Sequence, residues 1–476
     1  MGIREAIVRR VLTGLLLCAA LLEANMGFTQ ATDPGVRHAA TDGGPPLPMA
    51  GLTPDELTFF QDGLTRFAVV EVVAGATETT QGNGLGPRFN SNQCASCHAQ
   101  PYVGGSSPAT NPLFNVASAD GAQNEMPWFI AKNGPIREAR FVESNGVADG
   151  SVHDLFVITG RSDAGSSCNI AQPGFLPAGN PLTAQGGSSN IVFRIPTPVL
   201  GAGLIEAIPD STILANSRAN AAAKHQSGVA GHVNAVQGGN VNLSANDGTV
   251  TRFGWKAQNK SLLMFAGEAY NVEMGISNQL FPQERDETPG CQGGNATPND
   301  TDNFPAPATA PPMTSVLSDI EAFANFMRML APPAPATPTA VTQHGAALFA
   351  SVGCALCHTP MMMSGTAIAS GSYHSPSAAL SNQPARLYSD LLLHHMGSGL
   401  ADGITQGAAG PDEFRTAPLW GVGQRVFFLH DGRTSNLIQA ILDHAGSGSE
   451  ANQVVQNYKS LSAADQQALI DFLRSL

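Results

Sequence analysis

The sequence predicts a mainly α-helical chain of two domains, rich in loops and with a few short strands. The chain has 476 residues, more than one hydrophobic core usually organises. Its 51 Gly and 33 Pro residues, together with only 13% charged residues, indicate long connecting segments. One five-residue motif, Cys-x-x-Cys-His, occurs twice, at residues 94–98 and 354–358. A repeated motif in a chain of this length indicates one copy in each domain.

Each copy of the motif is an attachment site for c-type haem. Two thiols at this spacing form thioether bonds to the haem vinyl groups, and the following histidine becomes an axial ligand of the iron. With 7 Cys and 12 His in the chain, the motif is expected by chance only about 0.003 times. We therefore predict two covalently bound c-type haems, one in each of two cytochrome c-like domains. The residues predicted to hold them are Cys94, Cys97, His98, Cys354, Cys357 and His358.

The N-terminus has the pattern of a secretory signal. Arginines precede an apolar run over residues 11–22, which is too short to span a bilayer with ease. Thr29-Gln30-Ala31 follows as a cleavage site, with Ala24 as an alternative. Paired arginines also suit the twin-arginine route, but c-type haem is attached after export, which favours the general secretory route. We expect a signal peptide over residues 1–31, a periplasmic protein and no membrane-spanning segment.

Three cysteines lie outside the haem motifs. Cys18 falls within the expected signal peptide, which leaves Cys168 and Cys291. An even remainder in an oxidising compartment favours a disulfide between them, and two separate buried thiols are the alternative.

The charge of the chain bears on its partners. A net charge of −13 argues against nucleic acid or an anionic membrane surface. It suits a basic electron-donor or electron-acceptor protein, such as a small cytochrome or a cupredoxin.

Helix signals lie on both sides of each motif. Thr53, Pro54 and Glu56 form an N-cap, a first-turn proline and a capping-box acid for a helix that continues through Phe67. Further helices are expected over residues 314–330, 343–352 and 462–476, with Ser318-Glu321 and Ser462-Asp465 at N-caps.

The domain boundary is expected at a proline-rich linker. Residues 331–335 read Ala-Pro-Pro-Ala-Pro, which is stiff and extended. We predict an N-terminal haem domain over residues 32–335 and a C-terminal cytochrome c domain over 336–476. Residues 102–312 lack a regular pattern apart from short apolar runs, and we interpret them as an insertion packed over the first haem.

Several longer motifs resemble the bacterial di-haem oxidoreductase family. They are the runs at residues 201–209, 252–257, 386–397, 414–421, 428–433 and 440–444. The family is often labelled peroxidase or thiol oxidoreductase, and it is related to dihaem cytochrome c peroxidases and MauG-like enzymes. The chain has no spare cysteine pair at the spacing of a redox dithiol, so the thiol label finds no support.

The resemblance suggests a second axial ligand for the C-terminal haem. In dihaem peroxidases this ligand lies fourteen residues beyond the histidine of a Phe-His-Asp/Ser-Gly turn, and counting from His430 leads to His444. Peroxidases have Met there and MauG-like enzymes have Tyr. A His/His iron has a lower potential than a His/Met iron, which puts a high-potential electron-accepting role in question. Met396 is the competing ligand, and the resemblance aligns His394 with a histidine that lines the haem without binding iron.

The first haem departs from the peroxidase pattern. Peroxidases place a distal histidine sixteen residues after the proximal one, where this chain has Phe114. Either Met274 supplies the ligand or the position is open to peroxide or oxygen, and the open site is our hypothesis for catalysis. Cleavage of peroxide needs a group that moves a proton between its oxygens. Glu206, framed by apolar residues, is our candidate; an exposed residue in a turn is the alternative.

Electron transfer between the two haems is helped by an aromatic ring in the space between them. The chain has three tryptophans, Trp128, Trp255 and Trp420, and we favour Trp255, with core packing as the alternative.

Arginines are predicted to bind haem propionates. Arg88, Arg415, Arg425 and Arg433 are the candidates, and a solvated role is the alternative for each.

We predict a periplasmic, peroxidase-like dihaem oxidoreductase. Peroxide chemistry is expected at the His98 haem and electron transfer at the His358 haem. The rivals are an electron-transfer cytochrome without catalysis and a dihaem oxygenase that activates O2.

Overall fold

The computed structural model describes residues 30–39, 42–71, 85–86, 88–114, 116, 126–157, 172, 174–175, 190–235, 250–283, 285, 300, 314–366 and 377–476. The expected signal peptide, apart from Gln30 and Ala31, lies outside these residues, and so do Cys168 and Cys291. Within the described ranges no helix is long and apolar enough to cross a membrane.

The described part of the chain is mainly helical, as predicted. The longer helices are α2 (Pro54–Phe67), α6 (Asp210–Arg218), α8 (Leu262–Met274), α9 (Asp319–Met329), α10 (Ala340–Ser351), α12 (Asn452–Lys459) and α13 (Ala463–Ser475). The shorter α-helices are α3 (Cys94–Cys97), α5 (Ala202–Glu206), α7 (Ala221–Ser227) and α11 (Leu437–Asp443). Single 3-10 turns are η1 (Thr314–Val316), η2 (Cys354–Leu356) and η3 (Val422–Gln424).

The strands are short and form antiparallel pairs. The pairs are β1 (Arg88–Phe89) with β5 (Phe156–Val157), β2 (Glu138–Phe141) with β6 (Ile191–Arg194), β3 (Glu143–Ser144) with β4 (Val147–Ala148), β7 (Asn234–Ala235) with β8 (Val250–Thr251), β9 (Met362–Met363) with β10 (Pro384–Ala385), and β11 (Leu393–His395) with β12 (Glu413–Arg415). No larger sheet occurs in the described ranges, so loops and helices form the walls of the sites below.

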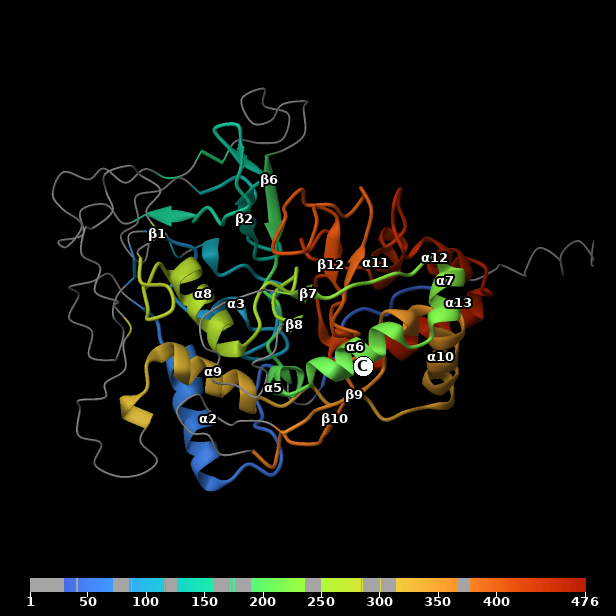
Figure 1. The fold of residues 1–476 in the computed structure, drawn as a ribbon, viewed down its shortest axis with the longest axis horizontal. Helices are drawn as coiled ribbons and strands as arrows, with labels where there is room; N and C mark the ends of the chain where they lie inside the picture. Colours follow the sequence, from blue (N-terminus) through green and yellow to red (C-terminus); the bar gives the residue numbers. More distant parts are fainter. Residues whose placement is uncertain are drawn as a thin grey trace, which may run out of the picture.

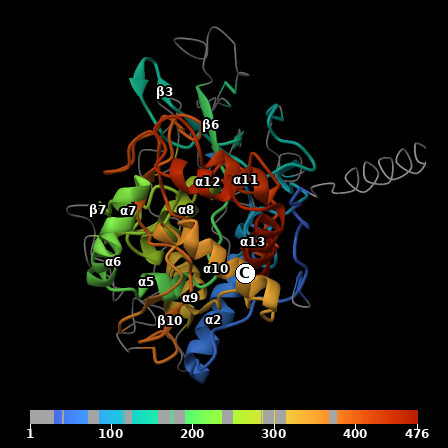
Figure 2. The same cartoon turned by 90° about the vertical axis from the view of Figure 1, so that its right-hand side faces the viewer.

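Two helix pairs organise the chain, one around each Cys-x-x-Cys-His motif (Figure 1). Helix α2 lies against α9, and α10 lies against α13. Each pair approaches closely at a glycine: a Cβ on Gly63 would overlap the backbone of Ala322, and a Cβ on Gly345 would overlap that of Ala468. The same two pairs are visible in the view turned by 90° (Figure 2). The arrangement therefore repeats a helix before the haem motif and a partner helix from later in the chain.

Each helix pair has its own apolar core. In the first, Phe326 packs against Phe60 and Phe67 with tilted rings whose centroids lie 5.5 and 4.9 Å apart. In the second, the rings of Phe349 and Phe472 lie 5.5 Å apart. The first core also includes side chains from the C-terminal half, such as Leu392. The two units therefore share packed residues and do not meet only at the linker.

The N-terminal segment packs on the C-terminal unit. The Asp33 carboxylate forms an ion pair of 2.7 Å with Arg474 of α13, and both side chains are buried. Asp33 also accepts a hydrogen bond of 2.6 Å from the backbone N of Leu437, at the start of α11. Part of the predicted first domain therefore lies against elements of the predicted second.

The capping signals placed the helix starts correctly. Thr53 and Glu56 form the reciprocal capping box of α2, and Ser462 accepts a hydrogen bond from the backbone N of Asp465 in α13. The helix expected over residues 314–330 is instead divided into η1 and α9, because Ser318 caps a new helix after a break.

The insertion is more regular than expected. Residues 102–312 were expected to be irregular, but they contain helices α5 to α8. Helix α8 lies against α9, and it forms one wall of the first haem cavity described below.

Candidate haem sites

The first motif opens into a large cavity. Cys94 and Cys97 lie on the short helix α3, and with His98 they line a space of about 1210 Å³, counted to its open mouth. Helix α8, the loop at residues 194–199 and α9 form the other walls. The prediction that the insertion covers the first motif fits this placement.

His98 is held in the orientation that an axial ligand needs. Its Nδ1 lies 3.1 Å from the backbone oxygen of Gly105, a contact that requires Nδ1 to carry the proton. Burial lowers the pKa of His98 to about 4, against the opposing effect of hydrogen bonds to the Gly105 and Thr197 backbone. The ring is therefore neutral, with Nε2 as the atom available to an iron.

A pair of carboxyl groups faces the same cavity. Glu273 at the end of α8 and Glu138 of β2 both line it and share a hydrogen bond. Asn90 donates a further hydrogen bond of 2.9 Å to Glu273. Burial raises the pKa of Glu273 well above its usual range, and the neighbouring Glu138 raises it further.

Glu138 is shifted in the opposite direction. Burial alone would raise the pKa of Glu138, but the charges of Arg140 and Arg194 outweigh burial and lower it. The Arg140 guanidinium also donates a hydrogen bond to the Glu138 carboxylate. Of the two carboxyls, Glu273 therefore holds a proton more strongly than Glu138. The sequence analysis missed this pair, because neither residue carries a local signal of the other.

Met274 is brought to the first cavity as well. It follows Glu273 on α8, is buried and lines the cavity with His98. Phe114, at the position of the peroxidases' distal histidine, is 44% exposed and does not line the cavity. The candidate residues for the first site thus come from α3, α8 and β2.

The second motif opens into a cavity of about 1430 Å³. Cys354, Cys357 and His358 line it, together with side chains from α10, α11 and α12. The Nδ1 of His358 lies 3.0 Å from the backbone oxygen of Tyr388, so this ring also presents Nε2 to the cavity. Burial lowers the pKa of His358 to about 4, and the next largest contribution comes from His444. Both rings line this cavity.

His444 is held like the two motif histidines. Its Nδ1 lies 2.6 Å from the backbone oxygen of Ala440, one turn earlier on α11. Burial lowers its pKa. Met396, the competing ligand, also lines the second cavity. Both candidates are therefore in place, and His444 alone has a hydrogen bond that directs its ligand atom.

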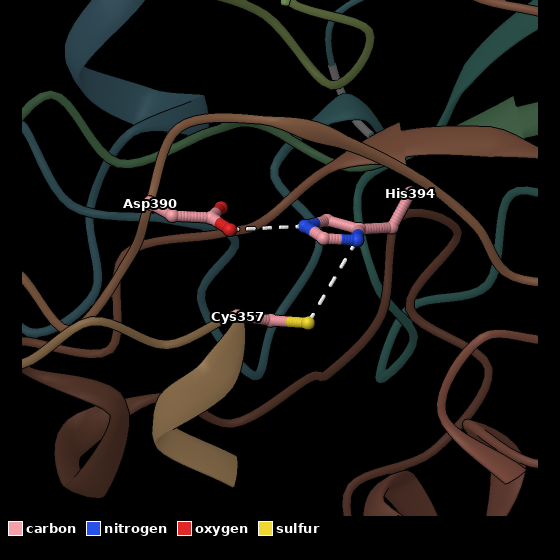
Figure 3. A group of neighbouring side chains, drawn as sticks. All are labelled: Cys357, Asp390 and His394. Carbon is pink, nitrogen blue, oxygen red and sulfur yellow. Dashed lines mark hydrogen bonds and ion pairs between the residues drawn. The ribbon is translucent and has the colours of Figure 1, made fainter. Parts of the chain in front are cut away.

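His394 is fully engaged by acidic groups. Figure 3 shows its ring in contact with the Asp390 carboxylate, at 3.0 Å, and with the Cys357 sulfur, at 3.8 Å. The Glu450 carboxylate lies 2.7 Å from Nδ1 of the same ring. Burial alone would lower the pKa of His394, but Cys357, Asp390 and Glu450 together raise it well above its usual range. A thioether sulfur carries no charge, so in a haem-bound chain the two carboxylates supply this effect. His394 therefore lines the second cavity as a charged group and does not present a free nitrogen.

His430 stacks on an aromatic ring in the second cavity. The His430 and Phe414 ring centroids lie 4.2 Å apart. Burial lowers the pKa of His430 to about 4. A neutral, stacked ring at this position forms part of the apolar wall.

Two buried arginines suit the carboxylates of a haem. Arg415 and Arg425 line the second cavity and donate to the backbone oxygens of Gly254 and Pro418, at 3.0 and 3.1 Å. Burial lowers the pKa of each to about 10. Within the described ranges neither forms an ion pair, so two buried cations face the cavity without a carboxylate partner of their own. Haem propionates are anions of the required kind.

The other predicted propionate partners lie elsewhere. Arg433 pairs with Asp431 at 2.8 Å and is partly exposed. Arg88 is buried, and neither residue lines a haem cavity.

The motif thiols also fit attachment by uncharged thioethers. Burial raises the pKa of Cys97 and of Cys354 to about 12, so the cavities disfavour thiolates there.

Trp255 joins the two sites. Among the described residues it alone lines both cavities. Its indole Nε1 donates a hydrogen bond of 2.8 Å to the backbone oxygen of Ile195, which fixes the ring. Trp128 is 52% exposed, and Trp420 lines only a smaller third cavity beside Trp255.

Glu206 lies away from both cavities. It is buried on α5, where it forms an ion pair of 2.6 Å with Arg328 of α9 and accepts a hydrogen bond of 2.8 Å from the backbone N of Leu262. Its apolar neighbours correctly indicated burial. Its partners connect α5, α8 and α9, so its position suits a structural role.

Comparisons with known proteins place the chain in a family. No curated protein matches it. Among solved structures, a MauG-like protein associated with microbial copper homeostasis is 19% identical over 36% of this chain and 55% of that chain, with a TM-score of 0.24. Hydrazine synthase of Kuenenia stuttgartiensis is 17% identical over 44% of this chain and 60% of that chain, with a TM-score of 0.25. The alignments thus span little more than half of either structure.

The family assignment rests on a family model. Residues 187–476 match the model described as "Di-haem oxidoreductase, putative peroxidase". The matched region covers more than half of the chain, including the second motif, His444 and the runs on which the resemblance was based. The chain therefore belongs to the di-haem oxidoreductase family.

Proposed function

We propose that the chain is a periplasmic dihaem c-type oxidoreductase that reduces hydrogen peroxide at its first site. One observation carries the proposal: two buried carboxyl groups that share a hydrogen bond, and whose pKa values are shifted in opposite directions, line the cavity that His98 also lines. Two carboxyls held in different protonation states supply an acid and a base at one place. A haem at this site supplies an iron position for peroxide and the electrons for its reduction.

The proton-handling group is Glu273. As the O–O bond breaks, its proton would be donated to the oxygen that leaves as the first water, and the Glu273-Glu138 pair would take up the proton of the other oxygen. Two electrons from the bound haems and two protons from solvent would complete the reduction of hydrogen peroxide to two water molecules. Glu138 accepts the hydrogen bond from Glu273 and so positions the proton. Asn90 also orients the Glu273 carboxyl, by donating a hydrogen bond to its Oε2 atom. Glu206, our candidate from the sequence, remains a proposal, but its ion pair with Arg328 favours a structural role.

The remaining residues hold and connect the two haems. Cys94 and Cys97 at the first site, and Cys354 and Cys357 at the second, form the thioethers. His98 and His358 bind the irons through Nε2. His444 completes the coordination at the second site, and Met396 is the alternative ligand. Trp255, which lines both cavities, lies between the sites for electron transfer.

The second site receives electrons from a partner. A small basic electron-carrier protein, such as a cytochrome or a cupredoxin, suits a chain with a net charge of −13. Export to the periplasm follows from c-type haem attachment and from the signal pattern.

A non-catalytic electron-transfer cytochrome is the second candidate. Met274 lines the first cavity with His98, and its thioether could complete the coordination of the first iron. The first site would then have no position for peroxide. The remaining alternative, O2 activation at an open first site, uses the same cavity.

Peroxide turnover by matched variants tests the proposal. Glu273→Gln keeps the shape of the side chain and removes its proton transfer, so turnover should fall by about 10²–10⁴-fold. Glu143→Gln, a carboxyl on β3 outside both cavities, should behave as wild type. Undiminished turnover in Glu273→Gln, or no turnover in the wild-type holoprotein with any electron donor, would contradict the proposal.

A further inference from the structure

Two histidines and a glutamate converge at the surface beside the second site. The Glu413 Oε1 atom lies 2.7 Å from the Nε2 atom of His232 and 3.1 Å from the Nε2 atom of His395. None of the three side chains lines a haem cavity. They therefore form a cluster that the proposed function does not use.

The backbone fixes this cluster. His395 of β11 and Glu413 of β12 are register partners in an antiparallel pair. His232 pairs with Leu393 through hydrogen bonds of 3.0 and 2.7 Å in both directions, and so adds a third strand-like segment to the pair. Three chain segments thus contribute one side chain each, and both rings contact the Glu413 carboxylate.

The far side of each ring is already occupied. The Nδ1 of His395 contacts the Asp412 carboxylate at 3.0 Å, and the Nδ1 of His232 contacts the backbone oxygen of Val233 at 3.1 Å. Both acceptors require Nδ1 to carry a proton. The Nε2 atom of each ring then faces Glu413 Oε1, which is itself an electron-pair donor. Each of these two contacts needs a proton or a cation between the nitrogen and the oxygen.

Second partners of this kind are typical of metal-binding histidines. A ligating histidine usually donates its other N–H to a carboxylate or a backbone carbonyl, which fixes the tautomer. The Glu413 carboxylate is held in the same way, because its Oε2 accepts a hydrogen bond of 2.7 Å from the backbone N of Gly410. All three donor groups are thus oriented by contacts outside the cluster.

The cluster is open to ions from solvent. The side chains of His232 and His395 are 46% and 51% exposed, whereas that of Glu413 is 5% exposed. The half-exposed rings can rotate to close on an ion, and water can fill its remaining positions. The buried carboxylate, with Asp412 nearby, supplies the negative charge that a divalent ion needs.

We propose that His232, His395 and Glu413 bind a divalent transition-metal ion of the zinc class. Two imidazole nitrogens and one carboxylate oxygen form a ligand set that zinc accepts. Calcium and magnesium prefer sites built from oxygen alone. The ion would join the segment around His232 to the hairpin of β11 and β12. His394 and Met396 on this hairpin line the second cavity, so the ion also braces that wall.

Zinc titration of the tag-free holoprotein tests the proposal. After dialysis against EDTA, calorimetry with Zn²⁺ should detect one site per chain, and excess Mg²⁺ should not compete. His232→Ala and His395→Ala should each abolish this site or weaken it by at least about tenfold, and Asp412→Asn should weaken it by about 10–100-fold. The visible haem spectrum of each variant checks that it has folded.

The matched control is His344→Ala. His344 is 55% exposed and pairs with Asp465 at 2.7 Å, away from the cluster, so its loss should leave zinc affinity unchanged. Thermal stability should rise with Zn²⁺ in wild type and in His344→Ala but not in His395→Ala. Absence of a zinc site in wild type would overturn the proposal, as would wild-type affinity in both cluster variants or an equal loss in His344→Ala.

Discussion

Glu273 and Glu138 share a hydrogen bond inside the first haem cavity, and their pKa values are shifted in opposite directions. Burial and the neighbouring Glu138 raise the pKa of Glu273. For Glu138, the charges of Arg140 and Arg194 overcome the effect of burial. A buried pair of this kind shares one proton near neutral pH, and it titrates as a unit.

The pH profile of peroxide turnover should therefore be bell-shaped. Below the lower apparent pKa both carboxyls are protonated and the pair cannot accept a proton. Above the higher one both are ionised and the pair cannot donate. Stopped-flow measurement across pH checks this, and Glu273→Gln should remove the alkaline limb from its residual activity. A flat wild-type profile would exclude the pair from the rate-determining step.

Replacement of the second axial ligand should change one haem only. His444→Ala should convert the second haem from low spin to high spin, because the Nδ1 contact to Ala440 directs Nε2 of His444 into the cavity. Met396→Leu, which preserves side-chain volume, should leave both spin states unchanged. Absorption and EPR spectra of the two ferric variants show which of them has a high-spin haem. High spin in Met396→Leu with no change in His444→Ala would reverse the ligand assignment.

Trp255 should control electron transfer between the sites. Trp255→Leu removes the ring that lines both cavities, so electron transfer from the second haem to the first should slow while both haem spectra are retained. Trp420→Leu, which removes an indole that lines neither cavity, serves as the control for loss of bulk. The rate of electron transfer to the first haem, measured after rapid reduction of the second haem, is compared among the two variants and wild type. Equal rates in Trp255→Leu and wild type would assign Trp255 to packing alone.

Glu206 should matter for stability and not for turnover. Glu206→Gln breaks a buried ion pair with Arg328, and removal of one partner of such a pair costs about 3–5 kcal/mol. Denaturant unfolding should show this loss, while peroxide turnover per folded molecule stays near the wild-type value. Full stability combined with a large loss of turnover would restore Glu206 as the catalytic carboxyl.

Local signals predicted the parts of the molecule that depend on local chemistry. The two motifs identified the haem-binding residues, and Thr53 and Ser462 marked the starts of α2 and α13. Helix α8 was missed because it is buried against α9 and the first cavity, so its sequence has no polar face. A pattern search for one apolar stripe cannot find a helix that is apolar on several sides.

Contacts between residues far apart in the sequence explain why the other site features were not predicted. The apolar frame of Glu206 indicated burial, but its partner Arg328 lies 122 residues away. Glu273 has no special neighbours in sequence, and its role depends on Glu138 from a distant strand. His232 and Glu413 are separated by 181 residues. Such pairs are defined by the fold, and no spacing rule within one segment reveals them.

EPR spectroscopy of the ferric holoprotein before and after addition of hydrogen peroxide tests the central claim most directly. A division of labour between the sites predicts one low-spin signal from the His358/His444 haem and one signal from the His98 haem that changes on addition of peroxide. Two low-spin signals that peroxide leaves unchanged would show both irons to be closed, and would contradict catalysis at the first site.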